Sequence, residues 1–215
     1  MRYLIFGDVH GNLPALEALL KVEKNNYDRL ISHGDIVNYG PWSNECVQLL
    51  STLPGLIALK GNHEDNYING NYSGSNKVAK TFFEFCYPKF SQFDLIEKYG
   101  ISFNLFDFEV THTIGGIYIY PDTDLSQIQL VKNYIIGHSH YQFDRIVDGR
   151  RIINTGSIGQ NRKMINVAEY IMYDDVEKTI KMKTFDYDID TVINKMESED
   201  YPQLCVDYYR NKNRR

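Results

Sequence analysis

The stretch Tyr3–Asn12 has the sequence YLIFGDVHGN and sets the pattern of the first half of the chain. An apolar run typical of a buried strand leads into a polar turn that carries Asp8 and His10, and leucines at helical spacing follow. The same order of apolar run, polar turn and amphipathic segment returns after Arg29–Ser32 and after Leu56–Leu59. This alternation of strands and helices predicts an α/β layered fold.

The first helix is expected to follow Asn12, whose side chain can cap the free backbone N–H groups of the first turn. A second helix is expected to begin near Ser43. Residues 66–100 differ from their surroundings, because a loop rich in Asn, Gly and Ser leads into an aromatic helical stretch interrupted by Pro88. We interpret this segment as a helical and loop cap inserted into a single domain that spans residues 1–215.

The second half of the chain is richer in strand patterns. Asp148 and Gly149, between two of these patterns, form a strong hairpin signal. A helix is expected at residues 189–196. The expected strands lie at residues 106–113, 116–120, 134–137, 143–147, 151–153, 169–173 and 179–184.

Composition and charge exclude several classes of protein. The 215 residues are 43% hydrophobic and 24% charged, which excludes a disordered chain or a collagen-like fibre. The net charge of −5 argues against a nucleic-acid partner, and no apolar run is long enough to cross a bilayer, so no membrane partner is expected. Since Cys46, Cys86 and Cys205 form no CxxC pair, we interpret them as free thiols of a cytoplasmic protein.

Five short polar clusters each follow a predicted strand. Ligand sites in open α/β sheets gather at the carboxyl ends of the strands, so these clusters are expected to converge. Residues i and i+2 of an extended chain point the same way. We therefore expect Asp8 with His10, and His138 with His140, to act as pairs. The clusters contain Asp8 and His10, Asp35, Asn62 and His63, His112, and His138 and His140.

These residue types fit a pair of metal ions. Carboxylates and imidazoles together suit zinc, manganese, iron or nickel, whereas an all-oxygen set suits magnesium or calcium. Two ions about 3.5–4 Å apart can clamp both the attacking and the leaving oxygen of a phosphoryl centre. The candidate ligands are too many for one ion and match two ions that share a carboxylate: Asp8, His10, Asp35, Asn62, His112, His138 and His140.

The motifs that contain these residues resemble the ordered motif set of the calcineurin-like metallophosphoesterases, in particular their small single-domain phosphodiesterase branch of bacteria and archaea. The resemblance spans nearly the whole chain. It implies an α/β fold of two packed mixed β-sheets flanked by helices, a four-layer sandwich. The motifs are DVHGN at 8–12, GDIVNYGP at 34–41, GNHE at 61–64, GHSH at 137–140 and NTGSIG at 154–159.

The family pattern implies two divalent ions, with Mn²⁺ as the first candidate and Fe, Ni, Zn, Co and Mg as alternatives. Asp35 would bridge the ions, as would a hydroxide that attacks phosphorus in line. His63 would donate a proton to the leaving oxygen or stabilise its charge, so the implied catalytic residues are Asp35, Asn62 and His63. One ion would be held by Asp8, His10, Asp35 and His140, and the other by Asp35, Asn62, His112 and His138.

Two departures from the family pattern bear on the loops and the substrate. Thr113 follows His112 where the family commonly has glycine, which alters the loop there. Tyr39 stands where the protein Ser/Thr phosphatases carry an arginine that grips a dianionic monoester. The absence of that arginine favours a phosphodiester, which carries one charge fewer.

We therefore predict a metal-dependent phosphoesterase that hydrolyses small phosphodiesters, with some activity on phosphomonoesters. Hydrolysis of nucleotides or dinucleoside polyphosphates, and protein phosphatase activity, are alternatives among enzymes. The alternative from another class is a non-catalytic protein-binding scaffold of the same fold. The sequence argues against it, because it keeps a candidate ligand at every metal-binding position of the family pattern. A DNA nuclease would be expected to add a DNA-binding region, and none is visible in the sequence.

Several residues have simpler explanations. His33 stands where the family has an apolar residue, so we expect it to pack in the core or to make an indirect hydrogen bond. The cap aromatics recur at helical spacing and are expected to be core residues. Residues 154–159 support the metal site from behind or form a plain turn, and Arg210–Arg215 are expected to be a solvated tail.

Overall fold

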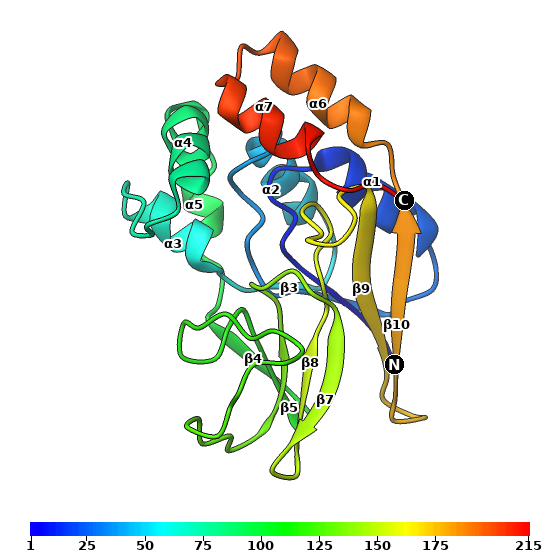
Figure 1. Cartoon of the computed structure of the whole chain (residues 1–215). Helices are drawn as coiled ribbons and strands as arrows, with labels where there is room; N and C mark the ends of the chain where they lie inside the picture. The colour runs from blue at the N-terminus through cyan, green and yellow to red at the C-terminus, as the bar shows by residue number, and fades with distance from the viewer.

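The computed structural model describes residues 1–215 and contains two mixed five-stranded β-sheets (Figure 1). The first sheet has the order β10-β9-β1-β2-β3, in which β1, β2 and β3 run parallel and β9 and β10 are antiparallel additions. Its strands are β1 (Arg2–Phe6), β2 (Arg29–Ser32), β3 (Leu56–Ala58), β9 (Val167–Asp174) and β10 (Thr179–Asp186).

The second sheet has the order β4-β5-β6-β8-β7. Its three central strands are parallel, and an antiparallel strand closes each edge. The predicted hairpin at Asp148 and Gly149 is confirmed, since it joins β7 to β8. The strands are β4 (Ser102–Leu105), β5 (Phe108–Thr111), β6 (Asn133–Ile136), β7 (Phe143–Val147) and β8 (Arg150–Asn154).

The two sheets pack face to face through a small aliphatic core. Alternate residues of a strand point to opposite faces, so Ile5 of β1 faces the second sheet while Leu4 and Phe6 face the helices. Ile135 of β6 and Ile153 of β8 meet Ile5 from the other side. This packing brings the carboxyl ends of the parallel strands of both sheets together.

Helices cover the outer face of the first sheet and enclose the larger core (Figure 1). The side chain of Asn12 caps the first helix by accepting a hydrogen bond from Ala15 N at 3.2 Å, as predicted. The aromatic cap residues Phe82, Phe83 and Phe90 are buried in this core, which confirms their predicted role. The helices are α1 (Leu13–Val22), α2 (Ser43–Ser51), α3 (Asn62–Ile68), α4 (Lys77–Cys86), η1 (Tyr87–Lys89), α5 (Phe93–Ile96), α6 (Ile189–Ser198) and α7 (Gln203–Arg210).

The predicted α/β class, two mixed sheets flanked by helices, is confirmed. The outer face of the second sheet is covered by loop 113–132, which packs Ile119 and Leu125 on Ile136 and Ile152. The strand predicted at 116–120 is therefore wrong. Its apolar residues pack as loop side chains.

Other local predictions also differ from the structure. The loop predicted at the start of residues 66–100 begins inside α3. Neither α7 nor β4 was predicted from the sequence. The C-terminal residues are not a free tail, because the backbone N–H of Arg215 donates to Asn166 Oδ1 at 2.8 Å and its guanidinium pairs with Asp186. Arg215 thus has its partner on β10, whereas Arg210 and Arg214 pair with Glu197 and Asp190 of α6. No helix is long and apolar enough to cross a membrane.

A buried glutamate joins α1 to the two antiparallel strands of the first sheet. Glu23 has no exposed surface and accepts hydrogen bonds from Tyr170 Oη and Lys183 Nζ. Burial favours its neutral form, but the Lys183 and Tyr170 hydrogen bonds hold the pKa of Glu23 below its ordinary value. The ionised carboxylate is therefore the form that this contact stabilises.

The lowered pKa of Glu23 predicts acid sensitivity of the fold. The stability that this group contributes is present above its unfolded pKa and is lost as the pH falls through the folded pKa. Glu23→Gln should therefore lose less melting temperature than the wild type between about pH 5 and pH 3. Glu17→Gln, an exposed change on the same helix, is the control and should follow the wild type. Three identical pH profiles in thermal denaturation would contradict the prediction.

Candidate metal centre

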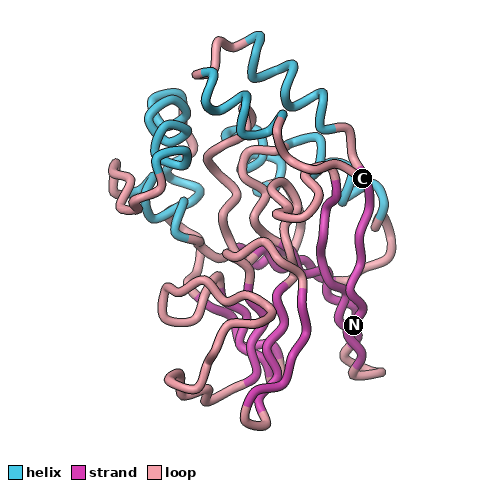
Figure 2. Tube along the Cα trace, viewed as in Figure 1, coloured by secondary structure: helices cyan, strands magenta, loops and turns pink.

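The loops that leave the parallel strands collect between the helices and the second sheet (Figure 2). The first sheet supplies the polar residues after β1 and β2 and at the start of α3, and the second supplies those after β5 and β6. The structure thus brings all five predicted clusters together. The predicted ligands other than Asn62, which is half-buried, are buried: Asp8, His10, Asp35, His112, His138 and His140.

The backbone at these residues is left-handed, not extended. The φ angle is 50° at Asp8, 53° at His10, 54° at Asp35, 68° at His138 and 59° at His140. Non-glycine residues adopt this region at an energetic cost, and such residues cluster at functional sites. The predicted i, i+2 pairing on an extended chain is therefore wrong in its geometry. Each polar turn instead bends its side chains toward one point.

The rings of His10 and His140 point their Nε2 atoms toward each other. His10 Nδ1 lies 3.3 Å from the carbonyl of Val37, and His140 Nδ1 lies 2.8 Å from the carbonyl of Gln160. A carbonyl only accepts, so both Nδ1 atoms carry the proton and both Nε2 atoms of the neutral rings carry a lone pair. These two Nε2 atoms are 3.2 Å apart. Two lone pairs at this distance repel each other unless a proton or a metal ion lies between the two nitrogens.

Two carboxylates complete this first group. Asp8 Oδ1 lies 3.1 Å from His140 Nε2 and 3.8 Å from His10 Nε2, and it is buried without a hydrogen-bond donor. Asp35 Oδ2 lies 3.9 Å from His10 Nε2. Ligands of one ion at metal–ligand distances near 2.1 Å are about 3–3.6 Å apart when adjacent and up to about 4.2 Å apart when opposite. The spacing and the donor set of the first group fit one divalent ion.

A second group lies on the other side of Asp35. His112 Nε2 is 3.1 Å from Asp35 Oδ2, 3.2 Å from Asn62 Oδ1 and 3.1 Å from His138 Nδ1. The same Asp35 oxygen thus belongs to both groups. The structure thus brings together the four residues expected for the second ion, and their donor types suit a divalent metal.

The protonation of these groups is set by their mutual proximity. Burial opposes ionisation of Asp8 and Asp35, but His140 beside Asp8 and His112 beside Asp35 hold both pKa values below the usual range. Burial would lower the pKa of His112, yet Asp35 raises it to about 9. Burial and the charge of His112 lower the pKa of His138 to about 3. In the metal-free protein His112 therefore carries a proton that a metal ion must displace.

His63 lies next to the first group without joining either one. Its ring centroid is 4.9 Å from that of His10, and its Nδ1 is 3.0 Å from Asn38 Nδ2. An amide nitrogen only donates, so Nδ1 accepts and the proton of neutral His63 is on Nε2. Burial lowers the pKa of His63, which favours this neutral form. The ring is held as a hydrogen-bond donor.

Glu64 is a structural residue of the site, and the sequence analysis predicted no role for it. It is buried, and its two carboxylate oxygens accept from the backbone N–H groups of Asp35, Ile36 and Gly61, each at 2.7 Å. It also accepts from Val37 N at 3.2 Å. Burial and the Asp35 charge raise the pKa of Glu64 to about 7, against the pull of these donors. Glu64 therefore ties the Asp35 loop to the start of α3.

His33 lies closer to the metal centre than expected. Its Nε2 is 2.7 Å from Thr155 Oγ1, which is not a predicted ligand, and one nitrogen of the buried ring lies within 4.8 Å of donor atoms of Asp8 and His112. A Cβ at Gly7 would lie 2.2 Å from the ring of His33, and one at Gly137 would lie 2.1 Å from it. Only glycine at these two positions leaves room for the ring beneath the ligands.

Segment 154–159 supports the site from behind, which decides between its two predicted roles. Ser157 Oγ donates to the carbonyl of Asp8 at 2.8 Å, and Asn154 Nδ2 donates to the carbonyl of Gly137 at 2.6 Å. Asn12 Nδ2 donates to the carbonyl of Gly159 at 3.2 Å. The first and last parts of the chain are thus joined directly behind the ligands.

Two further residues beside the site were missed. The ring of Tyr118 stacks on His138 with centroids 3.9 Å apart. Arg162 donates its backbone N–H to the carbonyl of His140 at 3.5 Å. Arg162 follows motif 154–159 by three residues, which is the one sequence signal that could have pointed to it.

The comparisons with known proteins agree with this geometry. The chain matches the calcineurin-like phosphoesterase family over residues 1–193. It is 28% identical to an uncharacterized protein of Methanocaldococcus jannaschii, with 93% of each chain covered. A metallophosphoesterase from Sphaerobacter thermophilus is similar in structure with a TM-score of 0.79 and 26% identity, over 98% of each chain. A hypothetical protein of Pyrococcus horikoshii shares the fold with a TM-score of 0.81 and 16% identity, over 97% of each chain. The chain therefore belongs to the calcineurin-like phosphoesterase family.

Proposed function

We propose that this protein is a dinuclear metal-dependent hydrolase of small phosphodiesters, with secondary activity on phosphomonoesters. The observation that carries the proposal is the pair of Nε2 lone pairs of His10 and His140, 3.2 Å apart beside the donor-free oxygen of Asp8. Neither neutral ring can donate to the other while both Nδ1 protons are held by carbonyls. A divalent cation satisfies all three atoms at once.

The residues of the site have distinct proposed roles. Divalent ions held there would neutralise phosphoryl oxygens and lower the pKa of the attacking water. Asp35 would hold both ions, and Asn62 would orient the second ion and the phosphoryl group. His63, with its proton on Nε2, would donate to the leaving oxygen. Asn38 positions that ring through its hydrogen bond to Nδ1.

The first candidate for both ions is Mn²⁺. A mixed set of carboxylate, amide and imidazole donors suits a metal between the hard magnesium ion and the softer zinc ion. Fe, Ni, Zn and Co also bind imidazole nitrogen and are alternatives. Mg prefers oxygen ligands and is therefore a weaker candidate at a site with several histidines. We also propose a reducing, cytoplasmic compartment, because all three cysteines are free thiols.

Metal removal and reconstitution test the proposal. Protein stripped with a chelator should lose hydrolysis of bis(4-nitrophenyl) phosphate, and Mn²⁺ should restore it with two ions bound per chain by elemental analysis. A panel of phosphodiesters and phosphomonoesters, assayed with each metal, then ranks the substrates. Full turnover by the stripped protein would refute the metal role. A metal-loaded protein with no turnover on any ester would favour the scaffold alternative.

A further inference from the structure

A cavity of about 470 Å³ opens beside the metal centre. Two of its lining residues contact proposed ligand histidines. The ring of Tyr118 stacks on His138, and the backbone N–H of Arg162 donates to the carbonyl of His140. None of its lining residues is acidic, although the whole chain carries a net charge of −5. The cavity is lined by Tyr72, Ser75, Asn76, Tyr118, Tyr120 and Arg162.

The guanidinium of Arg162 lacks an anionic partner. It is half-buried, and no carboxylate lies within 4.0 Å of it. Its one side-chain hydrogen bond is donated by Nη1 to Tyr208 Oη. An arginine side chain has five N–H donors, and a partly desolvated cation is costly without an anion. The remaining donors are available to an anion in the cavity.

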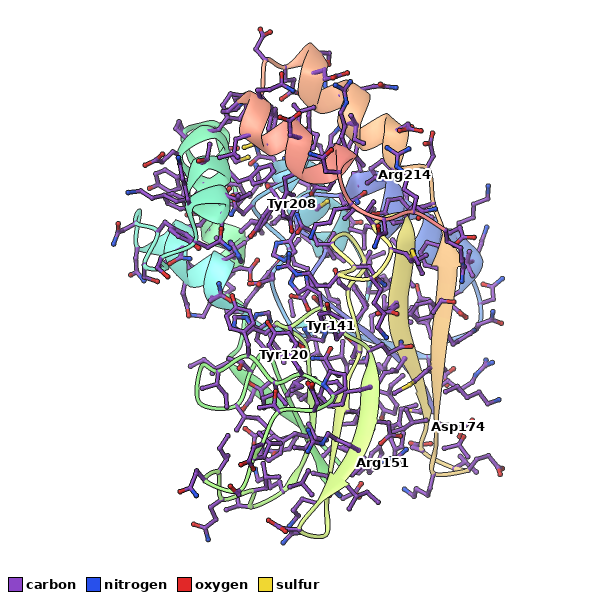
Figure 3. All side chains as sticks on the ribbon, viewed as in Figure 1. Tyr120, Tyr141, Arg151, Asp174, Tyr208 and Arg214 are labelled. Carbon is purple, nitrogen blue, oxygen red and sulfur yellow. The ribbon has the colours of Figure 1, made fainter.

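A second cation lies near Arg162. The Nζ atom of Lys212 is 4.7 Å from the ring centroid of Tyr208. Burial and then the charge of Arg162 lower the pKa of Lys212. In Figure 3, Tyr208, the partner of Arg162, lies on α7 in the upper half of the molecule, and Tyr120 of the cavity wall lies in the lower half.

Two tyrosines of loop 113–132 line the same cavity with nearly parallel rings. The rings of Tyr118 and Tyr120 are within 13° of parallel, and their centroids are 6.3 Å apart. Tyr118 is 51% exposed and Tyr120 is 39% exposed, in contrast to the buried aromatics of the cap. Exposed aromatic faces next to a cationic group are the usual means of binding a base together with its phosphate.

We infer that the substrates are nucleotides: Arg162 binds a phosphoryl group and Tyr118 with Tyr120 stacks the base. The inference rests on the proposed function, since it assigns the substrate of the same site. It also bears on the missing arginine at position 39, where this chain has Tyr39. The ring centroid of Tyr39 is 6.0 Å from that of Tyr208, the partner of Arg162. Arg162 thus brings a guanidinium from another loop to the region where position 39 has none.

Direct binding tests the inference without requiring turnover. Adenosine diphosphate and pyrophosphate are titrated by calorimetry into Mn²⁺-loaded protein after free metal has been removed. Arg162→Met should weaken both ligands about tenfold, because each loses a charge-assisted hydrogen bond. Tyr118→Leu should weaken adenosine diphosphate about tenfold and leave pyrophosphate unchanged, because only the nucleotide has a base to stack.

Matched variants separate recognition from folding. Tyr118→Phe keeps the ring and should bind adenosine diphosphate as the wild type does, and Arg150→Met, an exposed change at the tip of the β7–β8 hairpin, should bind both ligands normally. Metal content and melting temperature are measured for every variant. Unchanged binding of adenosine diphosphate by Arg162→Met and Tyr118→Leu overturns the inference. Arg162-dependent binding in a protein that hydrolyses no ester refutes the proposed function and retains the nucleotide site.

Discussion

Replacement of Asp35 by asparagine should reduce kcat/KM for phosphodiesters by about three orders of magnitude, whatever the leaving group. The same Oδ2 atom lies in both donor groups, 3.9 Å from His10 Nε2 and 3.1 Å from His112 Nε2. Loss of its charge weakens both metal sites at once, and several kcal/mol of transition-state stabilisation correspond to about 10³ in rate. Steady-state kinetics with saturating Mn²⁺, together with elemental analysis, measures the effect.

The control for this substitution is Asp94→Asn, an exposed change on α5 outside the site. It should leave kcat/KM and metal content unchanged. Asp35→Asn should bind fewer than two ions per chain and should no longer hold the pKa of His112 above its ordinary value, which NMR titration of the metal-free protein can follow. A variant that retains two ions and full activity would show that Asp35 does not bridge the sites.

Replacement of His63 by alanine should produce a loss that depends on the leaving group. Its neutral ring presents an N–H on Nε2, because Asn38 occupies Nδ1. A general acid contributes about 10²–10⁴ to the rate when the leaving oxygen needs a proton and little when it does not. We therefore expect about a 10³-fold loss on alkyl phosphodiesters and a much smaller loss on bis(4-nitrophenyl) phosphate.

The comparison of the two substrate classes is internal to the variant, so it is insensitive to the amount of folded protein. Asn38→Ala should give a smaller loss with the same dependence on leaving group, because the ring remains but is no longer oriented. Metal content should stay at two ions per chain in both variants, since His63 belongs to neither donor group. Equal losses on both substrate classes would remove His63 from the role of acid.

The sequence was sufficient to predict most of the strands and the convergence of the five polar clusters, because both follow from local pattern and from the rule that ligand sites form at the carboxyl ends of strands. Arg29–Ser32 and Phe143–Val147 are strands with the predicted bounds. The manner of convergence was not predicted. The left-handed backbone at Asp8 and His138 depends on tertiary contacts, such as the donation of His138 N to Asp8 Oδ2 at 3.1 Å.

Loop 113–132 was harder to predict, and so was the substrate cavity that it lines. Ile119 and Tyr120 alternate in a strand-like pattern, yet Ile119 packs on the second sheet without joining it. The role of Arg162 depends on Tyr208, 46 residues later in the chain, and no local signal connects the two. Apolar pattern identifies which residues are buried but does not identify the partner of a polar side chain.

The joining of distant parts of the chain behind the ligands has a consequence for synthesis. β1 precedes the other strands in the sequence but is central in its sheet, and its partner β9 ends at Asp174. The proposed first ion would need His10 and His140, 130 residues apart, and Ser157 must reach Asp8 across 149 residues. Contacts of this range form late because the loops between them must close first. The nascent chain can therefore bring the proposed metal ligands together and support them only after Ser157 has been made, so we expect metal uptake at a late stage of folding.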